Sequence, residues 1–426
     1  MGNKKYDVIG VLMKNTIKLQ KDITFNVQYI LILIMILFFG FTTLRIGMFG
    51  IGEAILLFFC ITQITSQRDI YISTEKHLFT IFWVYYIGVI TIGYTVNTFL
   101  AINPQFIKFD LMSYTVILFL CFTFESAFKK SSFSSLFKLL RFIYFGGIFV
   151  IGSLYFIYLK GIYTLFGFPL TYAGSSIFSP FANDYHQFAY FVAPLPFIGL
   201  YMIGKERNLF YKIVVLLGIV LCIKIGMATT SSTLESSWVI TTLLFCVLKV
   251  LEVLKGLNKS RSIIIAFFCF VILMLIINYE SIILFINDFF KGDSNGENRL
   301  TIWSNAIKAW KHSPIFGLGP GAFSGQEVFF GYEAHNTFLQ ILTQGGIMGG
   351  IAYIVLVKKL TKMASVNIYI LCAVVSLLAY GLGINDLRRT VLWFYFILFY
   401  FLSLKSKGGK SHEATVINHN CTGIQR

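Results

Sequence analysis

A histidine and an asparagine, His335 and Asn336, lie where a long polar segment meets a strongly apolar run. An imidazole accepts a proton near neutral pH, and an amide orients a hydroxyl or carbonyl group. Glu333, two residues earlier, offers a second base or a group that orients the imidazole. A helix cap or a solvated side chain is the commoner role for such a histidine. The spacing leaves the choice of base between His335 and Glu333 open.

A candidate cation and a glycine turn precede this pair. The guanidinium of Arg299 can hold two oxygens of one phosphate at the level of lipid headgroups. Anchoring to lipid phosphate is equally consistent with the sequence. Trp303 follows one helical turn later. Gly317 and Gly319 then predict a tight turn that allows the backbone to approach a ligand closely.

Further polar residues near the ends of apolar runs extend the candidate binding set. Lys224 lies inside a run but close enough to its end to snorkel. Asn183 and His186 form a polar cluster in another long loop, and Arg388 and Arg389 open the last run. Each residue is predicted either to line a polar cavity or to satisfy a neighbouring group.

Signatures of nucleotide- or metal-dependent enzymes are absent from the sequence. There is no Walker A loop, no dinucleotide-binding glycine motif after a strand and no HExxH. The 7 cysteines show no CxxC or cysteine–histidine metal spacing. We therefore expect no cofactor and no metal. A reaction at these residues has to use a substrate that is already activated.

The composition places these residues in an integral membrane protein. Of 426 residues, 57% are hydrophobic and 13% charged, whereas soluble domains average about 25% charged residues. Apolar runs long enough to cross a bilayer recur along the chain. They predict an all-α polytopic protein with about twelve transmembrane helices, near 26–44, 46–65, 78–99, 111–127, 138–159, 187–204, 210–228, 236–252, 262–279, 337–357, 366–384 and 388–404.

Lysine and arginine residues divide unevenly between the two sides of such a protein. A cytoplasmic N-terminus puts most of them inside, at 4–21, 129–130, 205–207, 255–261, 358–362 and 405–410. This is the positive-inside asymmetry. We therefore expect both termini in the cytoplasm and the candidate residues facing outward. The same asymmetry accounts for the net charge of +16 without a nucleic-acid partner.

Residues 1–426 are predicted to form one membrane domain with two long outer loops, 160–186 and 280–336. Both exceed the roughly 12–15 residues of ordinary connections. The second loop carries a helical pattern of large apolar residues, which predicts an amphipathic helix on the outer membrane surface. A helix that re-enters and packs against the bundle fits the pattern equally well. The pattern consists of Leu300, Trp303, Ile307 and Trp310.

The segment 299–350 resembles the signature region of the O-antigen ligase/polymerase superfamily of bacterial envelope glycan enzymes. An arginine-bearing loop helix leads to the sequence 314–319, then to His335-Asn336, and then to Gly346 and Gly349. The number of helices and the outer loop 160–186 agree more loosely. The paired glycines at 345–350 are also typical of close helix packing, which would seat His335 rigidly.

This resemblance implies a multi-pass glycosyltransferase of the bacterial inner membrane that needs neither nucleotide sugar nor metal. Such enzymes move a glycan from undecaprenyl diphosphate to an acceptor sugar. Wzy-type polymerases use a second lipid-linked repeat unit as acceptor, and WaaL-type ligases use the lipid A core. By resemblance, Arg299 with Lys224 or Arg388 would neutralise the diphosphate, and His335 would act on the acceptor hydroxyl.

One departure from the family pattern favours the polymerase. The ligases generally carry an arginine in a Thr/Ser-Arg-Ala step, where this chain reads Thr230-Ser231-Ser232-Thr233. We expect a polymerase that builds O-antigen, capsule or a similar surface polysaccharide, with a ligase as the alternative. A flippase or carrier for lipid-linked glycan is the alternative of another class. It is disfavoured because carriers typically have polar or broken midplane helices in both halves.

The expected partners follow from this reading. They are the lipid-linked donor and acceptor, membrane lipids, a flippase and a chain-length regulator.

Overall fold

The computed structural model describes residues 27–46, 49–66, 77–102, 105–172, 174–255, 283, 299–325 and 327–422. Nearly all regular structure in these residues is helical. Within this part of the chain, 7 helical segments are long and apolar enough to cross a membrane. The predicted all-α, polytopic class is confirmed.

The helices follow one another with short connections. The candidate spans are α3 (Leu78–Phe99), α4 (Ile107–Lys130), α5 (Phe133–Leu159), the pair α6 (Tyr185–Val192) and α7 (Leu195–Lys205), α8 (Leu209–Ala228), α9 (Ser232–Lys255) and α13 (Thr337–Ala364). Shorter apolar helices are Val27–Gly40, α2 (Ile51–Ser66) and α14 (Ile368–Tyr380). The remaining helices are α12 (Arg299–Trp310) and α15 (Thr390–Thr422).

Every predicted apolar run corresponds to a helix or a helix pair, except 262–279, which lies outside the described residues. Two runs differ in detail. The run 46–65 begins as a helix only at Ile51, because β1 (Arg45–Ile46) and β2 (Phe49–Gly50) pair as an antiparallel hairpin before it. The run 187–204 divides between α6 and α7 at Pro194, which has no backbone N–H to donate within a helix.

Helix α13 is interrupted at Gly346, where the backbone adopts φ 58° and ψ −159°. The loop after α12 occupies the interruption: Ile347 N donates to the Pro314 carbonyl at 2.8 Å, and Leu318 N donates to the Thr343 carbonyl at 2.7 Å. These bonds replace helical ones that the break removes. A Cβ on Gly346 would lie 2.3 Å from the Ile315 carbonyl oxygen. Gly346 therefore receives a loop, whereas the sequence predicted helix-to-helix packing there.

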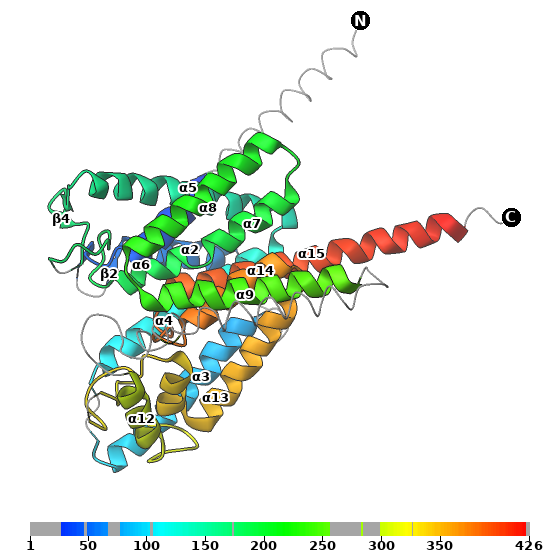
Figure 1. Ribbon diagram of the computed structural model, residues 1–426. Helices are drawn as coiled ribbons and strands as arrows, with labels where there is room; N and C mark the ends of the chain where they lie inside the picture. The colour runs from blue at the N-terminus through cyan, green and yellow to red at the C-terminus, as the bar shows by residue number, and fades with distance from the viewer. Residues whose placement is uncertain are drawn as a thin grey trace, which may run out of the picture.

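The loops gather at one end of the bundle. Figure 1 shows β2, β4 and α12 at that end, whereas α15 leaves the bundle at the other. The hairpin of β3 (Thr164–Leu165) and β4 (Phe168–Pro169) belongs to the predicted loop 160–186. At the opposite end α4 finishes with Lys129 and Lys130, and Lys405 Nζ donates to the Lys129 carbonyl at 2.8 Å. The two long loops thus meet far from this lysine-rich end.

Candidate functional site

A cavity of about 460 Å³ lies at the loop end of the bundle. Its walls come from the start of α4, the start of α6, the start of α12, the segment 331–335 and the loop 384–389. Segments that are far apart in the sequence therefore share one space. Its acidic, basic and histidine lining residues are Asp184, His186, Arg299, Glu333, His335, Arg388 and Arg389.

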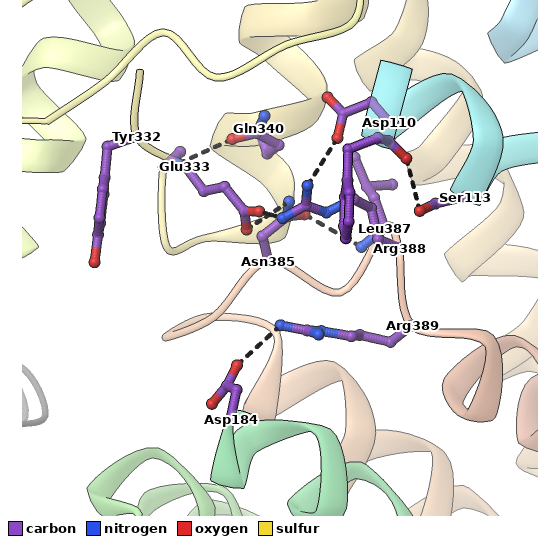
Figure 2. A network of polar contacts seen from close by, with 12 residues as sticks. Asp110, Ser113, Asp184, Tyr332, Glu333, Gln340, Asn385, Leu387, Arg388 and Arg389 are labelled. Carbon is purple, nitrogen blue, oxygen red and sulfur yellow. Dashed lines mark hydrogen bonds and ion pairs between the residues drawn. The ribbon is translucent and has the colours of Figure 1, made fainter. Parts of the chain in front are cut away.

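Arg388 is held on both sides by carboxylates. Its Nη1 lies 3.1 Å from Asp110 Oδ1, and its Nη2 forms an ion pair with Glu333. The guanidinium also lies 4.8 Å from the ring centroid of Phe109. Burial lowers the pKa of Arg388, with the Asp110 charge opposing that effect and Arg389 adding to it. Figure 2 shows this row of contacts running from Glu333 to Asp110.

Glu333 is engaged through both carboxylate oxygens. One oxygen pairs with Arg388, and the other accepts a hydrogen bond from Asn385 Nδ2 at 3.0 Å. Asn385 and Arg388 belong to the same loop after α14. In this arrangement Glu333 orients Arg388 and ties the segment before α13 to that loop.

Arg389 points to the opposite wall of the cavity. Its Nη2 lies 3.4 Å from Asp184 Oδ2, and Figure 2 shows this pair apart from the Arg388 row. Asp184 also caps α6 by accepting from His186 N at 2.9 Å. Burial alone would raise the pKa of Asp184, but the charges of His186 and Arg389 and the backbone hydrogen bond lower it overall. Asp184 therefore stays ionised and holds Arg389 in place.

His335 lies in the cavity wall with a left-handed backbone, φ 46°. Residues other than glycine seldom adopt this conformation, and it persists where the surroundings enforce it. The imidazole stacks on the Tyr332 ring with centroids 5.0 Å apart. Asn336, the next residue, caps α13: its Oδ1 accepts from Leu339 N at 3.1 Å and its Nδ2 donates to the Leu382 carbonyl at 3.0 Å. These bonds fix the position from which His335 enters the cavity.

Arg299 is almost completely buried, with 1% of its surface exposed. Its Nη2 donates to Thr233 Oγ1 at the start of α9 at 2.9 Å. It shares the inward face of α12 with Ile302, while Leu300 and Ile307 are exposed on the outward face. An outward apolar face suits a helix at the boundary between lipid and water. The predicted apolar pattern therefore describes chiefly the side of α12 that faces away from the cavity.

One segment of the chain that contributes to this cavity is similar to a known protein family. Residues 217–354 match the model of the family described as O-antigen ligase. The matched segment is less than half of the chain, and this segment is similar to that family. The resemblance to the O-antigen ligase/polymerase superfamily is thus confirmed, and the matched segment suggests a glycosyltransferase-like enzyme of a bacterial membrane. A search of curated proteins finds no match.

The matched segment supplies only part of the cavity. Arg299, Glu333 and His335 lie within the matched residues 217–354. His186, Arg388 and Arg389, which the sequence also predicted as binding residues, come from outside the matched segment. The fold brings all six together.

The other predicted binding residues do not line this cavity. Lys224 is exposed on α8, Trp303 is half-buried on α12, and Asn336 caps α13. Gly317 and Gly319 make the close backbone approach that was predicted, but to helices: a Cβ would lie 2.4 Å from the Gln344 carbonyl oxygen or 2.5 Å from Tyr94 N, respectively. Asn183 lines an adjoining cavity.

Asp110, on α4, is the main site residue that sequence reasoning missed. It is 2% exposed, and its Oδ2 accepts from Gly321 N and Gln344 Nε2, both at 2.8 Å. With its bond to Arg388, it joins α4 to the loop after α12, to α13 and to the loop before α15. A carboxylate directly before the apolar run 111–127 was the available signal, since ionisable groups in membrane segments are usually functional.

A second buried carboxyl group lies beside the cavity, at Asp386. It receives a hydrogen bond from the Tyr190 hydroxyl, and burial raises its pKa to about 8. His186, in the cavity wall, contacts the Tyr380 hydroxyl through Nδ1 at 2.7 Å. Tyr190 and Tyr380 pack edge to face with centroids 4.7 Å apart. These aromatic residues form a rigid support under one wall.

Proposed function

We propose that this protein is a membrane glycosyltransferase that polymerises undecaprenyl-diphosphate-linked oligosaccharide repeat units for O-antigen, capsule or a similar surface polysaccharide. The observation that carries the proposal is the cavity in which three arginines, Arg299, Arg388 and Arg389, share the wall with His335 and His186. The similarity of residues 217–354 to the O-antigen ligase family supports the reaction class.

The three guanidinium groups supply positive charge where a diphosphate has to leave. Departure of undecaprenyl diphosphate builds negative charge on its oxygens, and fixed cations in a site of low dielectric stabilise that charge strongly. Arginine forks bind phosphate oxygens in pairs. Of the two cations expected beside Arg299, Arg388 lines the cavity together with Arg389, whereas Lys224 is exposed and does not line it.

His335 is the base in this proposal. Both oxygens of Glu333 are already engaged, so protonation of Glu333 would break its ion pair with Arg388. His335 takes the proton of the acceptor hydroxyl as the hydroxyl oxygen attacks the anomeric carbon of the donor sugar. The bond from that carbon to the diphosphate breaks, and undecaprenyl diphosphate leaves with the electron pair. Glu333 acts indirectly, by positioning Arg388.

The distribution of lysines supports a cavity on the outer face. Lys129 and Lys130 end α4, Lys205 ends α7, and Lys358 and Lys359 lie in the second half of α13. All are distant from the helix starts that line the cavity. By the positive-inside tendency, the lysine-rich end faces the cytoplasm and the cavity faces outward.

The ligase is the second candidate, favoured by the description of the matching family as O-antigen ligase. In that case the acceptor is the lipid A core instead of a second lipid-linked repeat unit. A carrier is less well supported, because the break in α13 is filled by hydrogen-bonded loop backbone.

The lipid profile of a deletion strain separates the two candidates. Complementation with the His335→Ala variant should reproduce the deletion, with single repeat units on the acceptor and no long polymer. The His312→Ala variant is the matched control, because His312 is exposed and packs edge to face against Phe329, and neither residue lines the cavity. Normal chain length with His335→Ala contradicts the role of this histidine. Accumulated lipid-linked polymer that is never transferred identifies a ligase.

A further inference from the structure

A second cavity, of about 250 Å³, adjoins the first. Both cavities are lined by Phe109, Gln187, Arg388 and Arg389. The two arginines therefore stand between the cavities and are accessible from each of them. His335 and Glu333 line only the larger cavity, whereas Arg45 and Glu53 line only the smaller one.

The smaller cavity has an apolar side and a cationic side. Its apolar wall includes Phe39, Phe49, Met112 and Val116, from the helix Val27–Gly40, from β2 and from α4. Phe49 is 61% exposed, so this wall reaches the outer surface of the bundle. A ligand with an anionic head and a hydrocarbon chain matches this division.

Arg45 adds a third guanidinium to the cationic side. Its Nη2 lies 2.9 Å from Glu53 and 3.2 Å from the Phe39 carbonyl oxygen. Burial lowers the pKa of Arg45, with Glu53 opposing and the nearby positive charge of Arg389 adding to the effect. Among the described residues, the Nε atoms of Arg45 and Arg389 are buried without a hydrogen-bond partner. An anion between these arginines would accept their hydrogen bonds and relieve their repulsion.

We infer that the smaller cavity binds the diphosphate and the first isoprene units of a second lipid-linked substrate, so that the enzyme holds two polyprenyl diphosphates at once, one on each side of Arg388 and Arg389. This inference rests on the proposed function and deepens it. A polymerase needs two such substrates, whereas a ligase needs one. The larger cavity then has the room for the sugars, and the smaller cavity has room only for a headgroup and the beginning of a chain.

A tryptophan placed in the smaller cavity tests the inference. Ser113 lines that cavity from α4, so Ser113→Trp should fill the cavity and leave the larger one open. Thr115→Trp is the matched control, two residues along the same helix, where Thr115 is exposed and lines neither cavity. Thermal melting of both variants verifies that they fold.

The measurement is native mass spectrometry of the detergent-purified full chain with undecaprenyl diphosphate. The wild type and Thr115→Trp should bind two equivalents, and Ser113→Trp should bind one. Arg45→Gln should weaken the second binding step at least tenfold and leave the first unchanged. Phosphatidylglycerol at equal concentration should not displace the second equivalent.

The other outcomes overturn either the proposed function or the second site alone. No binding to the wild type overturns the proposed function itself. A single equivalent, bound equally by the wild type and Ser113→Trp, overturns only the second site. Complete loss of binding in Ser113→Trp shows one donor site in the smaller cavity, which also overturns the two-substrate inference. Displacement of the second equivalent by phosphatidylglycerol assigns the cavity to bulk lipid and overturns the inference as well.

Discussion

Two buried carboxylates on one helix, Asp110 and Glu125 of α4, have different partners and different consequences. Asp110 is 2% exposed and Glu125 is fully buried. Asp110 lies at the loop end of the bundle and pairs with the cation Arg388. Glu125 lies four turns further along, where all the partners that the structure gives it are neutral donors. Asp110 therefore positions a residue of the candidate site, whereas Glu125 stabilises the fold.

Glu125 caps a neighbouring helix. Its carboxylate accepts from Phe79 N at 2.8 Å, from Thr80 N at 2.9 Å and from Thr80 Oγ1 at 2.6 Å. His77, the N-cap residue of α3, makes no side-chain capping bond of its own. The first N–H groups of a helix need acceptors, and a negative charge there also complements the helix dipole. Burial and residue type therefore did not distinguish the two acids, whereas their partners did.

The largest expected effect is that of Asp110→Ala. Removing one partner of a buried ion pair costs about 3–5 kcal/mol, because the other charge stays buried and unpaired. If half or more of this cost falls on the placement of Arg388, polymer synthesis drops at least about tenfold. The measurement is turnover per folded enzyme, beside the melting temperature.

Asp110→Asn makes that test specific. The amide keeps an acceptor for Gly321 N but has no charge to hold Arg388. The melting temperature of Asp110→Asn should be close to that of the wild type, whereas its turnover should stay close to that of Asp110→Ala. Thr115→Ala, an exposed change on the same helix, should alter neither. Full turnover with Asp110→Asn would reduce Asp110 to a structural residue like Glu125.

The next effect in size is that of Glu125→Ala, on stability alone. It leaves the two N–H groups and one hydroxyl at the start of α3 without their acceptor, and each buried donor left unsatisfied costs about 1–3 kcal/mol. The melting temperature should fall by several degrees, while turnover per folded molecule well below that temperature stays at the wild-type value. A loss of turnover in Glu125→Ala without a lower melting temperature would contradict the purely structural role assigned to Glu125.

A third carboxyl group, Asp386, gives a smaller, pH-dependent effect. Its pKa in the folded protein, about 8, lies above the ordinary value of 3.8 because the group is buried. The folded state therefore keeps a proton that the unfolded state loses near pH 4. The contribution of Asp386 to stability is greatest below that pH and falls as the pH rises towards 8, by at most about 1.4 kcal/mol per pH unit.

Melting curves across this pH range test the sign. Asp386→Asn should flatten the decline. Asp184 should behave in the opposite way, since its pKa is lowered: its contribution is present above the ordinary aspartate range and is lost as the pH falls. Asp184→Asn should therefore remove stability at neutral pH. Parallel curves for the wild type and Asp386→Asn would contradict the raised pKa.

Prediction from the sequence succeeded where the signal is local. Apolar runs identified the helices, because a segment in hydrocarbon has to satisfy its own backbone hydrogen bonds. The placement of Lys224 and Trp303 was less predictable, because a helix turns each side chain by a fixed angle and an error of one or two residues moves it to another face. Asn336 illustrates a different limit, since capping and ligand binding use the same amide and the sequence does not separate them.

The chain by itself determined that this is a helical membrane protein, it showed a segment similar to the O-antigen ligase family, and it pointed to Arg299, Glu333 and His335. Tertiary structure alone decided that His186, Arg388 and Arg389 join them, that Asp110 holds Arg388, and that Gly346 admits a loop. The physical reason is that hydropathy and motif spacing act over a few turns of helix. Ion pairs and cavities instead depend on how helices hundreds of residues apart pack together.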